Sequence, residues 1–198
     1  MKLSHEIALC LLGGLALLAG SSSGEEAKTN SDGVSNTMIV AEFKAETPGW
    51  EAVNDGVMGG LSAGAGVIRD GVMHFSGNLS LENNGGFSSV RTEEGSWDLS
   101  GKTHLRLRVK GDGRTYILRL YTDARHRGSR IAYGAEFPTK DGKWSEVDIP
   151  VFRFKPSHHG DLLEGPDLDL SSIRQVGLQL SDGKAGAFAL EVEWIKAH

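Results

Sequence analysis

Two glycine-rich segments carry the side chains whose types and spacing are best suited to recognition chemistry. Residues 50–62 read WEAVNDGVMGGLS, and residues 79–91 read LSLENNGGFSSVR. In each segment a Gly-Gly pair follows short polar side chains, and serine comes soon after. Glycine permits close backbone approach or a positive φ, while short polar side chains cap turns or face a ligand. We expect the two segments to lie together, either as one binding site or as two loops packed for structural reasons.

The candidate contact residues come from these segments, with one tyrosine and one arginine from farther along the chain. They are Trp50, Asn54, Asp55, Met58, Gly59, Gly60, Ser62, Asn83, Asn84, Gly85, Gly86, Phe87, Arg91, Tyr121 and Arg125. Seven of them are predicted to be neighbours in space: Asn54, Asp55, Gly59, Gly60, Asn83, Gly85 and Gly86. Valine in place of Gly60 should destabilise the fold if a positive φ is required there.

Ser62 lies in a match to the pattern G-x-S-x-G at residues 60–64, which is typical of a hydrolase nucleophile. That chemistry needs a strand before the serine and a helix after it, and a base that takes the hydroxyl proton. Residues 65–71 are broken by glycine, and His74 is expected on the outer face of its strand. We therefore predict that Ser62 is no nucleophile and makes a turn hydrogen bond to nearby backbone.

A histidine pair followed by acidic residues raises the question of a metal site. The residues are His158, His159, Asp161, Glu164, Asp167 and Asp169. Adjacent side chains on an extended segment point apart, whereas zinc needs converging ligands. The oxygen spacing of an EF-hand loop is also absent. A solvated loop is the preferred interpretation and a calcium site is the alternative, so that no metal and no cofactor is expected.

A local basic cluster surrounds one predicted loop. It consists of Arg119, Arg125, His126, Arg127 and Arg130. Such a cluster can pair with a carboxylate or phosphate of a partner. The alternative is a solvated face whose charge the acidic remainder of the chain balances.

The elements that must position these residues have the period of β-strands. Apolar and polar residues alternate over 105–110 and again over 117–121, after a Gly111-Asp112-Gly113 turn. Near the end of the chain, two further runs each place their apolar side chains on one face: Val176, Leu178 and Leu180, then Phe188, Leu190, Val192 and Trp194. Asp141-Gly142 and Asp182-Gly183 are hairpin-type turn signals. The pattern predicts an all-β, two-sheet sandwich of nine or ten strands.

Composition supports this fold class and excludes several functions. Of 198 residues, 21 are Lys or Arg and 26 are Asp or Glu, which gives a net charge of −5. The chain therefore lacks the excess of basic residues that is typical of nucleic-acid-binding proteins. There are 27 glycines, about twice the average share, as expected for many tight turns. Cys10 is the single cysteine, so the chain has no internal disulfide and no cysteine-based zinc site.

The N-terminus has the pattern of an export signal. Residues 7–18 form an apolar run shorter than the about 20 residues that span a bilayer. Ala19 and Ser21 are small residues at the positions that favour cleavage after Ser21. We predict a signal peptide over 1–21, a flexible tether over 22–37 and a folded domain over 38–198. The processed protein is then expected to be periplasmic or extracellular, without a stable membrane span.

The two glycine-rich segments resemble the CIA30 family, named after complex I intermediate-associated protein 30. Its pattern reads approximately W-x-x-V-N-D-x-V-M-G-G-x-S, then F-x-G, then L-x-x-x-N-N-G-G-F-x-S-x-R. The first and second parts are matched by Trp50, Val53, Asn54, Asp55, Val57, Met58, Gly59, Gly60, Ser62, Phe75 and Gly77. The third is matched by Leu81, Asn83, Asn84, Gly85, Gly86, Phe87, Ser89 and Arg91. The resemblance covers about residues 43–195 and implies a galactose-binding-like jelly-roll β-sandwich.

The resemblance also implies a function without established catalytic chemistry. The expected role is that of a binding module for a protein partner, in the manner of an assembly factor or chaperone of complex I. The alternative is a carbohydrate-binding module of the envelope or extracellular space, by analogy of fold. A sugar binder should expose aromatic side chains along a groove, with Trp50, Trp97, Tyr121 and Tyr133 as candidates. A protein binder should expose a contiguous apolar patch.

Overall fold

The computed structural model describes residues 37–44, 47 and 50–198. The predicted signal peptide, and the predicted tether except for Thr37, lie outside the described residues. Among the residues that are described, no helix is long and apolar enough to cross a membrane.

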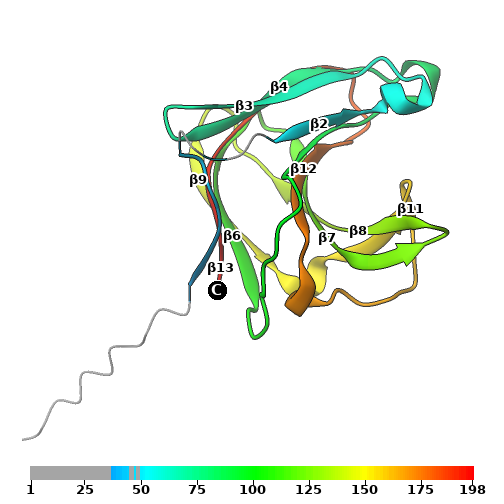
Figure 1. Ribbon diagram of the computed structural model, residues 1–198. Coiled ribbons are helices and arrows are strands. Elements are labelled where there is room, and N and C mark those ends of the chain that lie inside the picture. Colours follow the sequence, from blue (N-terminus) through cyan, green and yellow to red (C-terminus); the bar gives the residue numbers. More distant parts are fainter. Residues whose placement is uncertain (1–36, 45–46, 48–49) are drawn as a thin grey trace, which may run out of the picture. The chain divides into compact units, whose positions relative to one another are not determined.

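Two antiparallel sheets make up the domain (Figure 1). The first sheet has the order β3 (Ala63–Arg69), β4 (Val72–Leu79), β13 (Gly186–Ala197), β6 (His104–Lys110) and β9 (Trp144–Pro150), and β1 (Met38–Glu42) also pairs with β13. The second has the order β11 (Asp161–Leu162), β10 (Lys155–His158), β8 (Ser129–Pro138), β7 (Thr115–His126), β12 (Gln175–Leu180), β5 (Ser88–Arg91) and β2 (Glu51–Asn54). The predicted jelly-roll β-sandwich is confirmed.

The described part of the chain has thirteen strands, more than the nine or ten predicted. The additional strands are short, such as β2, β10 and β11, and a strand of two to four residues shows too few alternations to be recognised. The helical segments are single turns of 3-10 helix: η1 (Asp55–Met58), η2 (Glu82–Asn84), η3 (Val151–Arg153) and η4 (Leu170–Ser172). The absence of long helical periodicity in the sequence agrees with this.

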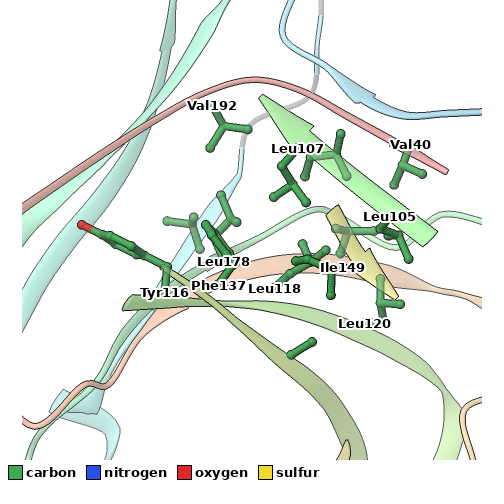
Figure 2. Packing of buried hydrophobic residues seen from close by; sticks show 14 of the residues in the cluster. Val40, Leu105, Leu107, Tyr116, Leu118, Leu120, Phe137, Ile149, Leu178 and Val192 are labelled. Atoms are coloured by element: carbon green, nitrogen blue, oxygen red, sulfur yellow. The ribbon is translucent and has the colours of Figure 1, made fainter. Parts of the chain in front are cut away.

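The core lies between the facing sides of the two sheets (Figure 2). On β6, Leu105 and Leu107 are fully buried, and on β7 Leu118 and Leu120 face them from the other sheet. The predicted inward face of β12, which carries Val176, Leu178 and Leu180, is also fully buried. Removal of this apolar surface from water is the main stabilising contribution to the sandwich.

The turn signals are located correctly, but they do not mark hairpins. Gly111-Asp112-Gly113 leads from β6 to β7, Asp141-Gly142 from β8 to β9, and Asp182-Gly183 from β12 to β13. In each case the two strands belong to different sheets. The hairpin turns are instead Asp70-Gly71, Arg127-Gly128 and His159-Gly160, where both residues have a positive φ. Two successive residues with a positive φ give a turn whose twist matches that of paired strands. A turn that joins strands of different sheets does not require a positive φ at both residues.

The predicted inward face of the last strand is wrong at its end. A bulge between Val192 and Trp194 shifts the register of β13 against β6. Ile195 is therefore fully buried, while Trp194 is half-buried with the Lys196 ammonium 4.3 Å from its ring centroid. An extra residue on one strand reverses the faces that follow it, which alternation alone does not show.

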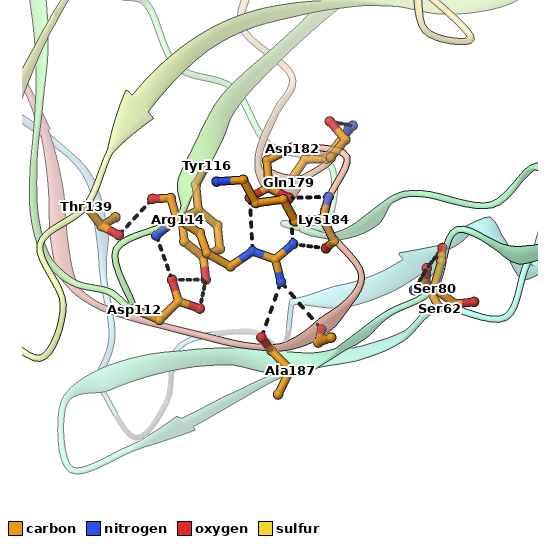
Figure 3. Close-up of polar contacts among 12 residues, drawn as sticks. Ser62, Ser80, Asp112, Arg114, Tyr116, Thr139, Gln179, Asp182, Lys184 and Ala187 are labelled. Carbon is orange, nitrogen blue, oxygen red and sulfur yellow. Dashed lines mark hydrogen bonds and ion pairs between the residues drawn. The ribbon is translucent and has the colours of Figure 1, made fainter.

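A buried ion pair closes one end of the sandwich (Figure 3). The Arg114 guanidinium donates to both carboxylate oxygens of Asp182, at 2.5 and 3.0 Å. It also donates to the carbonyl oxygens of Lys184 and Ala187. The start of β7 is thereby tied to the β12–β13 connection, and both charged side chains are about 10% exposed.

Candidate functional site

Asp55 joins the two glycine-rich segments. It opens η1, and its side chain is fully buried. Oδ1 accepts from the Ser62 backbone N–H at 2.9 Å, and Oδ2 accepts from the Ser62 hydroxyl at 2.5 Å. Oδ2 also accepts from the backbone N–H groups of Gly86, at 2.7 Å, and Phe87, at 3.2 Å. The two segments are thus held together as predicted.

These hydrogen bonds keep Asp55 ionised. Burial acts to raise the pKa of the carboxyl group, but the Ser62 hydroxyl and the backbone N–H groups of Gly86, Ser62 and Phe87 outweigh it, so that the pKa lies below its ordinary value. Four hydrogen-bond donors of the protein replace the water molecules that an exposed carboxylate would bind. The role of Asp55 is to position the loops.

The Gly-Gly pairs serve Asp55 in two different ways. A Cβ at Gly60 would lie 2.4 Å from the Asp55 Cγ, and one at Gly85 would lie 2.7 Å from the Asp55 Oδ2. Gly59 and Gly86 have φ values of +89° and +134°. The condition of a positive φ is thus not met at Gly60, and the alternative of close backbone approach applies. Gly60 is needed for close approach, and the positive φ belongs to its neighbour.

Ser62 bridges three segments of backbone and does not cap a local turn. Besides donating to Asp55, its hydroxyl accepts from the backbone N–H of Ser80 at 3.0 Å, as Figure 3 shows. The predicted turn bond to nearby backbone is thus replaced by one to a residue 18 positions away. His74 lies on β4 between the buried Met73 and Phe75, on the outer face, as predicted. Its Nδ1 is 3.5 Å from Arg69 Nη2. Ser62 is buried and has no histidine partner in the described structure.

The loops held by Asp55 form one wall of a groove on the outer face of the second sheet. The groove has a volume of about 1090 Å³. Its floor consists of outward-facing residues of β5, β12, β7, β8 and β10. Val57, Met58 and Phe87 line it from the first wall, and Leu162 lines it from the β10–β11 hairpin. Val57 and Leu162 are more than three-quarters exposed, so each rim presents an exposed apolar side chain, next to the polar His159 on the second rim.

A row of basic residues and glycines crosses the floor at right angles to the strands. The strand registers pair Arg91 of β5 with Gly177 of β12, Gly177 with Arg119 of β7, Arg119 with Gly134 of β8, and Gly134 with Lys155 of β10. At the edge strand, Glu51 is opposite Arg91. Paired residues on neighbouring strands project from the same face. The arginines are therefore separated by positions without a side chain.

Arg119 is fixed by polar neighbours, none of them acidic. Its Nε donates to the Gln179 Oε1 at 2.9 Å, and its Nη1 donates to the Ser157 Oγ at 2.8 Å. Burial lowers the pKa of Arg119; the Tyr121 hydroxyl acts in the opposite direction, and the positive charge of Arg91 lowers the pKa again.

Arg91 reaches across the glycine gap toward β7. Its guanidinium carbon lies 5.4 Å from the centroid of the Tyr121 ring. Its Nε is buried and has no hydrogen-bond partner in the described structure. Over the residues that are described, no carboxylate forms an ion pair with Arg91 or Arg119.

The predicted contact residues fall into three groups. Those that line the groove are Met58, Asn84, Gly85, Gly86, Phe87, Arg91 and Tyr121. Those that belong to or support the loops from outside the groove lining are Asn54, Asp55, Gly59, Gly60, Ser62 and Asn83. Two are elsewhere: Trp50 is 6% exposed and packs against Phe43, and Arg125 donates to the Gly128 carbonyl in the β7–β8 turn.

The aromatic side chains expected to be exposed for sugar binding are not exposed. Trp50, Tyr121 and Tyr133 are each at most 9% exposed. Trp97 is half-buried and donates from its Nε1 to the Val40 carbonyl. Trp50, Tyr133 and Trp97 lie in or against the core, and Tyr121 lies on the groove floor, where the Arg91 guanidinium is beside its ring.

The predicted basic cluster is divided between two places. Arg119 is on the groove floor, whereas Arg130 forms ion pairs with Glu94 at 2.6 Å and Asp123 at 3.5 Å. The His126 and His158 rings pack edge to face, with centroids 5.0 Å apart and an interplanar angle of 65°. In the part of the chain that the structure describes, no group of three or more His, Cys, Asp and Glu residues is placed to hold a metal ion.

Sequence reasoning did not place the other half of the groove. Arg119 was named in the basic cluster and His159 in the histidine pair, but neither was assigned to this site. The polar and charged lining residues that were not among the candidate contacts or in those two clusters are Ser89, Glu136, Arg153, Lys155, Ser157, Gln179 and Ser181. Two signals were available: Arg119 alternates with the buried Leu118 and Leu120, and Gly134 and Gly177 interrupt strands. An isolated glycine in a strand marks close approach of another group.

The family model described as complex I intermediate-associated protein 30 (CIA30) matches residues 41–192. The chain belongs to the CIA30 family. Mitochondrial complex I intermediate-associated protein 30 of Mus musculus is 36% identical over 104 residues, which are 50% of this chain and 31% of that protein. The Neurospora crassa protein of the same name is 28% identical over 144 residues, 60% of this chain and 49% of that protein. The match thus spans at most about half the length of these CIA30 relatives.

Solved structures with the same fold include carbohydrate-binding modules. The family 11 module of the cellulosomal cellulase Lic26A-Cel5E of Clostridium thermocellum superposes with a TM-score of 0.61 at 15% identity, over 81% of this chain and 93% of the module. A family 11 module from the same organism, in complex with a β-1,3-1,4-mixed-linked tetrasaccharide, gives 0.60 at 16% identity, over 81% and 94%. At these identities the likeness shows that the CIA30 domain shares the galactose-binding-like sandwich of these modules.

Proposed function

We propose that this CIA30 domain is a non-enzymatic binding module whose groove holds a segment of a protein partner, in the manner of an assembly factor. Family membership supports the assembly role, since the two curated relatives carry the name of a complex I intermediate-associated protein. The observation that carries the proposal is the groove itself, with apolar side chains exposed on both rims.

The apolar rim fits a protein partner. Val57, Met58, Leu61 and Leu81 are 47–77% exposed, and all lie in the segments that Asp55 holds together. Leu162, 76% exposed, lies across the groove. Exposed apolar patches bordered by polar residues are typical of protein interaction sites, and methionine adapts to varied partners.

Carbohydrate binding is the second candidate function. The likeness to family 11 modules favours it, one of them being solved with a bound tetrasaccharide. Against it, the two aromatic side chains that line the groove are Phe87, which is half-buried in the loop wall, and Tyr121, which is 9% exposed and has the Arg91 guanidinium beside its ring. A sugar ring has little open aromatic face to stack on.

A non-catalytic role is supported by the state of Ser62. Its hydroxyl donates to the Asp55 carboxylate, which also accepts hydrogen bonds from backbone N–H groups. A nucleophilic serine needs a base that is free to take its proton and a reachable substrate. Ser62 is 7% exposed and meets neither condition.

Site-specific photo-crosslinking tests the proposal. A benzoylphenylalanine is placed at Met58 or Leu162 on the two rims, and at Val67, which is 54% exposed on β3 of the other sheet, as control. We expect the same protein to be captured from both rims and not from Val67. That protein, once purified, should bind the wild-type domain and lose affinity for Met58→Glu. Equal capture from all three positions, or a glycan adduct at the rims alone, contradicts the proposal.

A further inference from the structure

We propose that the groove floor is a carboxylate-binding site, in which Arg91 and Arg119, on either side of Gly177, receive an acidic side chain of an extended partner segment. The inference rests on the proposed function of the groove as a protein-binding site, and adds the chemistry that the partner must present.

The arrangement of the two guanidinium groups is the first argument. Arg91 and Arg119 are both paired with Gly177, so that their Cα atoms are two strand spacings, roughly 10 Å, apart. The Arg91 guanidinium lies over the Tyr121 ring, which belongs to the same strand as Arg119. Gly177 places no side chain between them; a Cβ there would lie 3.0 Å from the Val90 carbonyl oxygen and in van der Waals contact with the Arg91 Cβ, at 3.4 Å, and the Tyr121 Cε2, at 3.6 Å. The Arg91 guanidinium is thus directed toward the strand of Arg119, over the position of Gly177, which has no side chain.

Uncompensated charge is the second argument. The groove is lined by Arg91, Arg119, Arg153 and Lys155, but by one carboxylate, Glu136, although the chain as a whole has a net charge of −5. Glu51 is opposite Arg91 on the edge strand β2, but it does not line the groove and forms no ion pair with Arg91 among the described residues. A desolvated cation next to another cation is unfavourable unless an anion joins them. Arg119 shows the effect of both burial and the neighbouring charge, since each lowers its pKa.

Unused donors are the third argument. A guanidinium has five N–H donors. Arg119 uses Nε and Nη1 toward Gln179 and Ser157, and its Nη2 has no acceptor among the described residues. The Arg91 Nε is buried without an acceptor. A carboxylate offers four lone-pair sites in a plane, which is the shape that guanidinium groups bind best.

The apolar rims favour a peptide carboxylate over the uronate of an acidic polysaccharide. In an extended peptide, residues i−2 and i+2 lie on the same side as residue i, at about 6.6 Å from it. Leu162 on β11 is four strand spacings, roughly 19 Å, from β12, so an acidic residue over Gly177 leaves its i−2 and i+2 neighbours above the floor, and aliphatic side chains farther along the segment extend toward Met58 on one rim and Leu162 on the other. A polyuronate has no such side chains, and its repeated charges would also meet Glu136. The ligand class is an extended segment with one acidic residue between aliphatic ones.

Two matched peptides test the inference by isothermal titration calorimetry. The probes are acetylated and amidated Thr-Leu-Glu-Leu-Thr and the same peptide with Gln in place of Glu. We expect the Glu peptide to bind the full domain at least tenfold more tightly. Arg91→Gln and Arg119→Gln should each remove that difference, whereas Arg106→Gln should keep it. Arg106 is the matched control, because it lies on β6 in the other sheet and pairs with Asp148.

Side-chain spectra provide a readout that is independent of the variants. In wild-type protein labelled with ¹⁵N, the Nε–H signals of Arg91 and Arg119 should shift on addition of the Glu peptide and not of the Gln peptide. Equal affinity of both peptides overturns the carboxylate inference and leaves the protein-binding function standing. Binding of tri-galacturonate in the absence of peptide binding overturns both. Failure of every probe to bind overturns the inference as well.

Discussion

At the scale of single residues, Asp55 determines the shape of the site. Four donors from two segments converge on its carboxylate, and glycine at positions 60 and 85 gives it room. The sequence predicts that the segments meet, because both carry Gly-Gly pairs beside polar residues. It does not predict that one buried carboxylate joins them, since Asp55 and the neighbouring Asn54 look equally suited to cap a turn.

Asp55→Asn should lower the free energy of unfolding at neutral pH by about 2–3 kcal/mol, because an amide cannot replace a charged acceptor of four hydrogen bonds. The folded-state pKa lies below the ordinary value of 3.8, so the unfolded chain binds the proton more tightly. The stabilisation by Asp55 is therefore complete above that value and is lost as the pH falls through the lower folded-state pKa. Urea unfolding of both proteins between pH 7 and pH 3 measures this. A difference that grows toward low pH contradicts it.

Gly60→Ala and Gly59→Ala separate close approach from backbone conformation. At Gly60 the added Cβ would overlap the Asp55 carboxyl group, and we expect a loss of about 2–3 kcal/mol. At Gly59 there is open space, and a positive φ alone should cost about 1 kcal/mol. Thermal unfolding of the two variants side by side gives the order. A larger loss at Gly59 shows that the Asp55 contact is not what requires glycine at position 60.

At the scale of elements, alternation predicts the long strands well and the connections poorly. The inward faces of β6, β7 and β12 are as predicted, because residues that alternate in a long strand leave no other choice of face. The Asp-Gly pairs were interpreted as hairpin turns, but they connect strands of different sheets. The bulge in β13 moves Trp194 off the predicted inward face. Both depend on which strands become partners, and that depends on contacts between residues far apart in the sequence.

Asp182→Asn tests the ion pair that stabilises the connection between β12 and β13. Arg114 would lose its hydrogen-bonded carboxylate and remain among three carbonyl oxygens, with the weaker electrostatic interaction with Asp112, in a place where both partners are about 10% exposed. Breaking such a pair should lower the free energy of unfolding by about 3 kcal/mol. The matched control is Asp148→Asn, whose partner Arg106 is 39% exposed. We expect less than about 1 kcal/mol there. Equal effects in denaturant titrations contradict a special role for Arg114.

At the scale of the whole molecule, the groove is a product of strand order. Its central row joins residues 91, 177, 119, 134 and 155, which come from five strands. The fold class and the first wall of the groove could be predicted from local patterns and from the family resemblance. The row could not, because it exists only once β12 is inserted between β5 and β7. Arg119 was accordingly grouped with the arginines that follow it in the sequence.

Residues 1–21 are predicted to be removed when the protein is exported. The prediction rests on an apolar run too short for a bilayer, followed by small residues at 19 and 21. Mass spectrometry of the protein recovered from the periplasm or medium should give a chain that begins at Ser22. Among the residues that the structure describes, Val53 is the first that lines the groove, and we expect processing to leave the affinity of the groove for its partner unchanged. The matched control is Ala19→Arg, which should block cleavage and hold the chain at the membrane. A wild-type chain that keeps Met1 in the membrane fraction contradicts the assignment, and the groove would then act on a partner at the membrane surface.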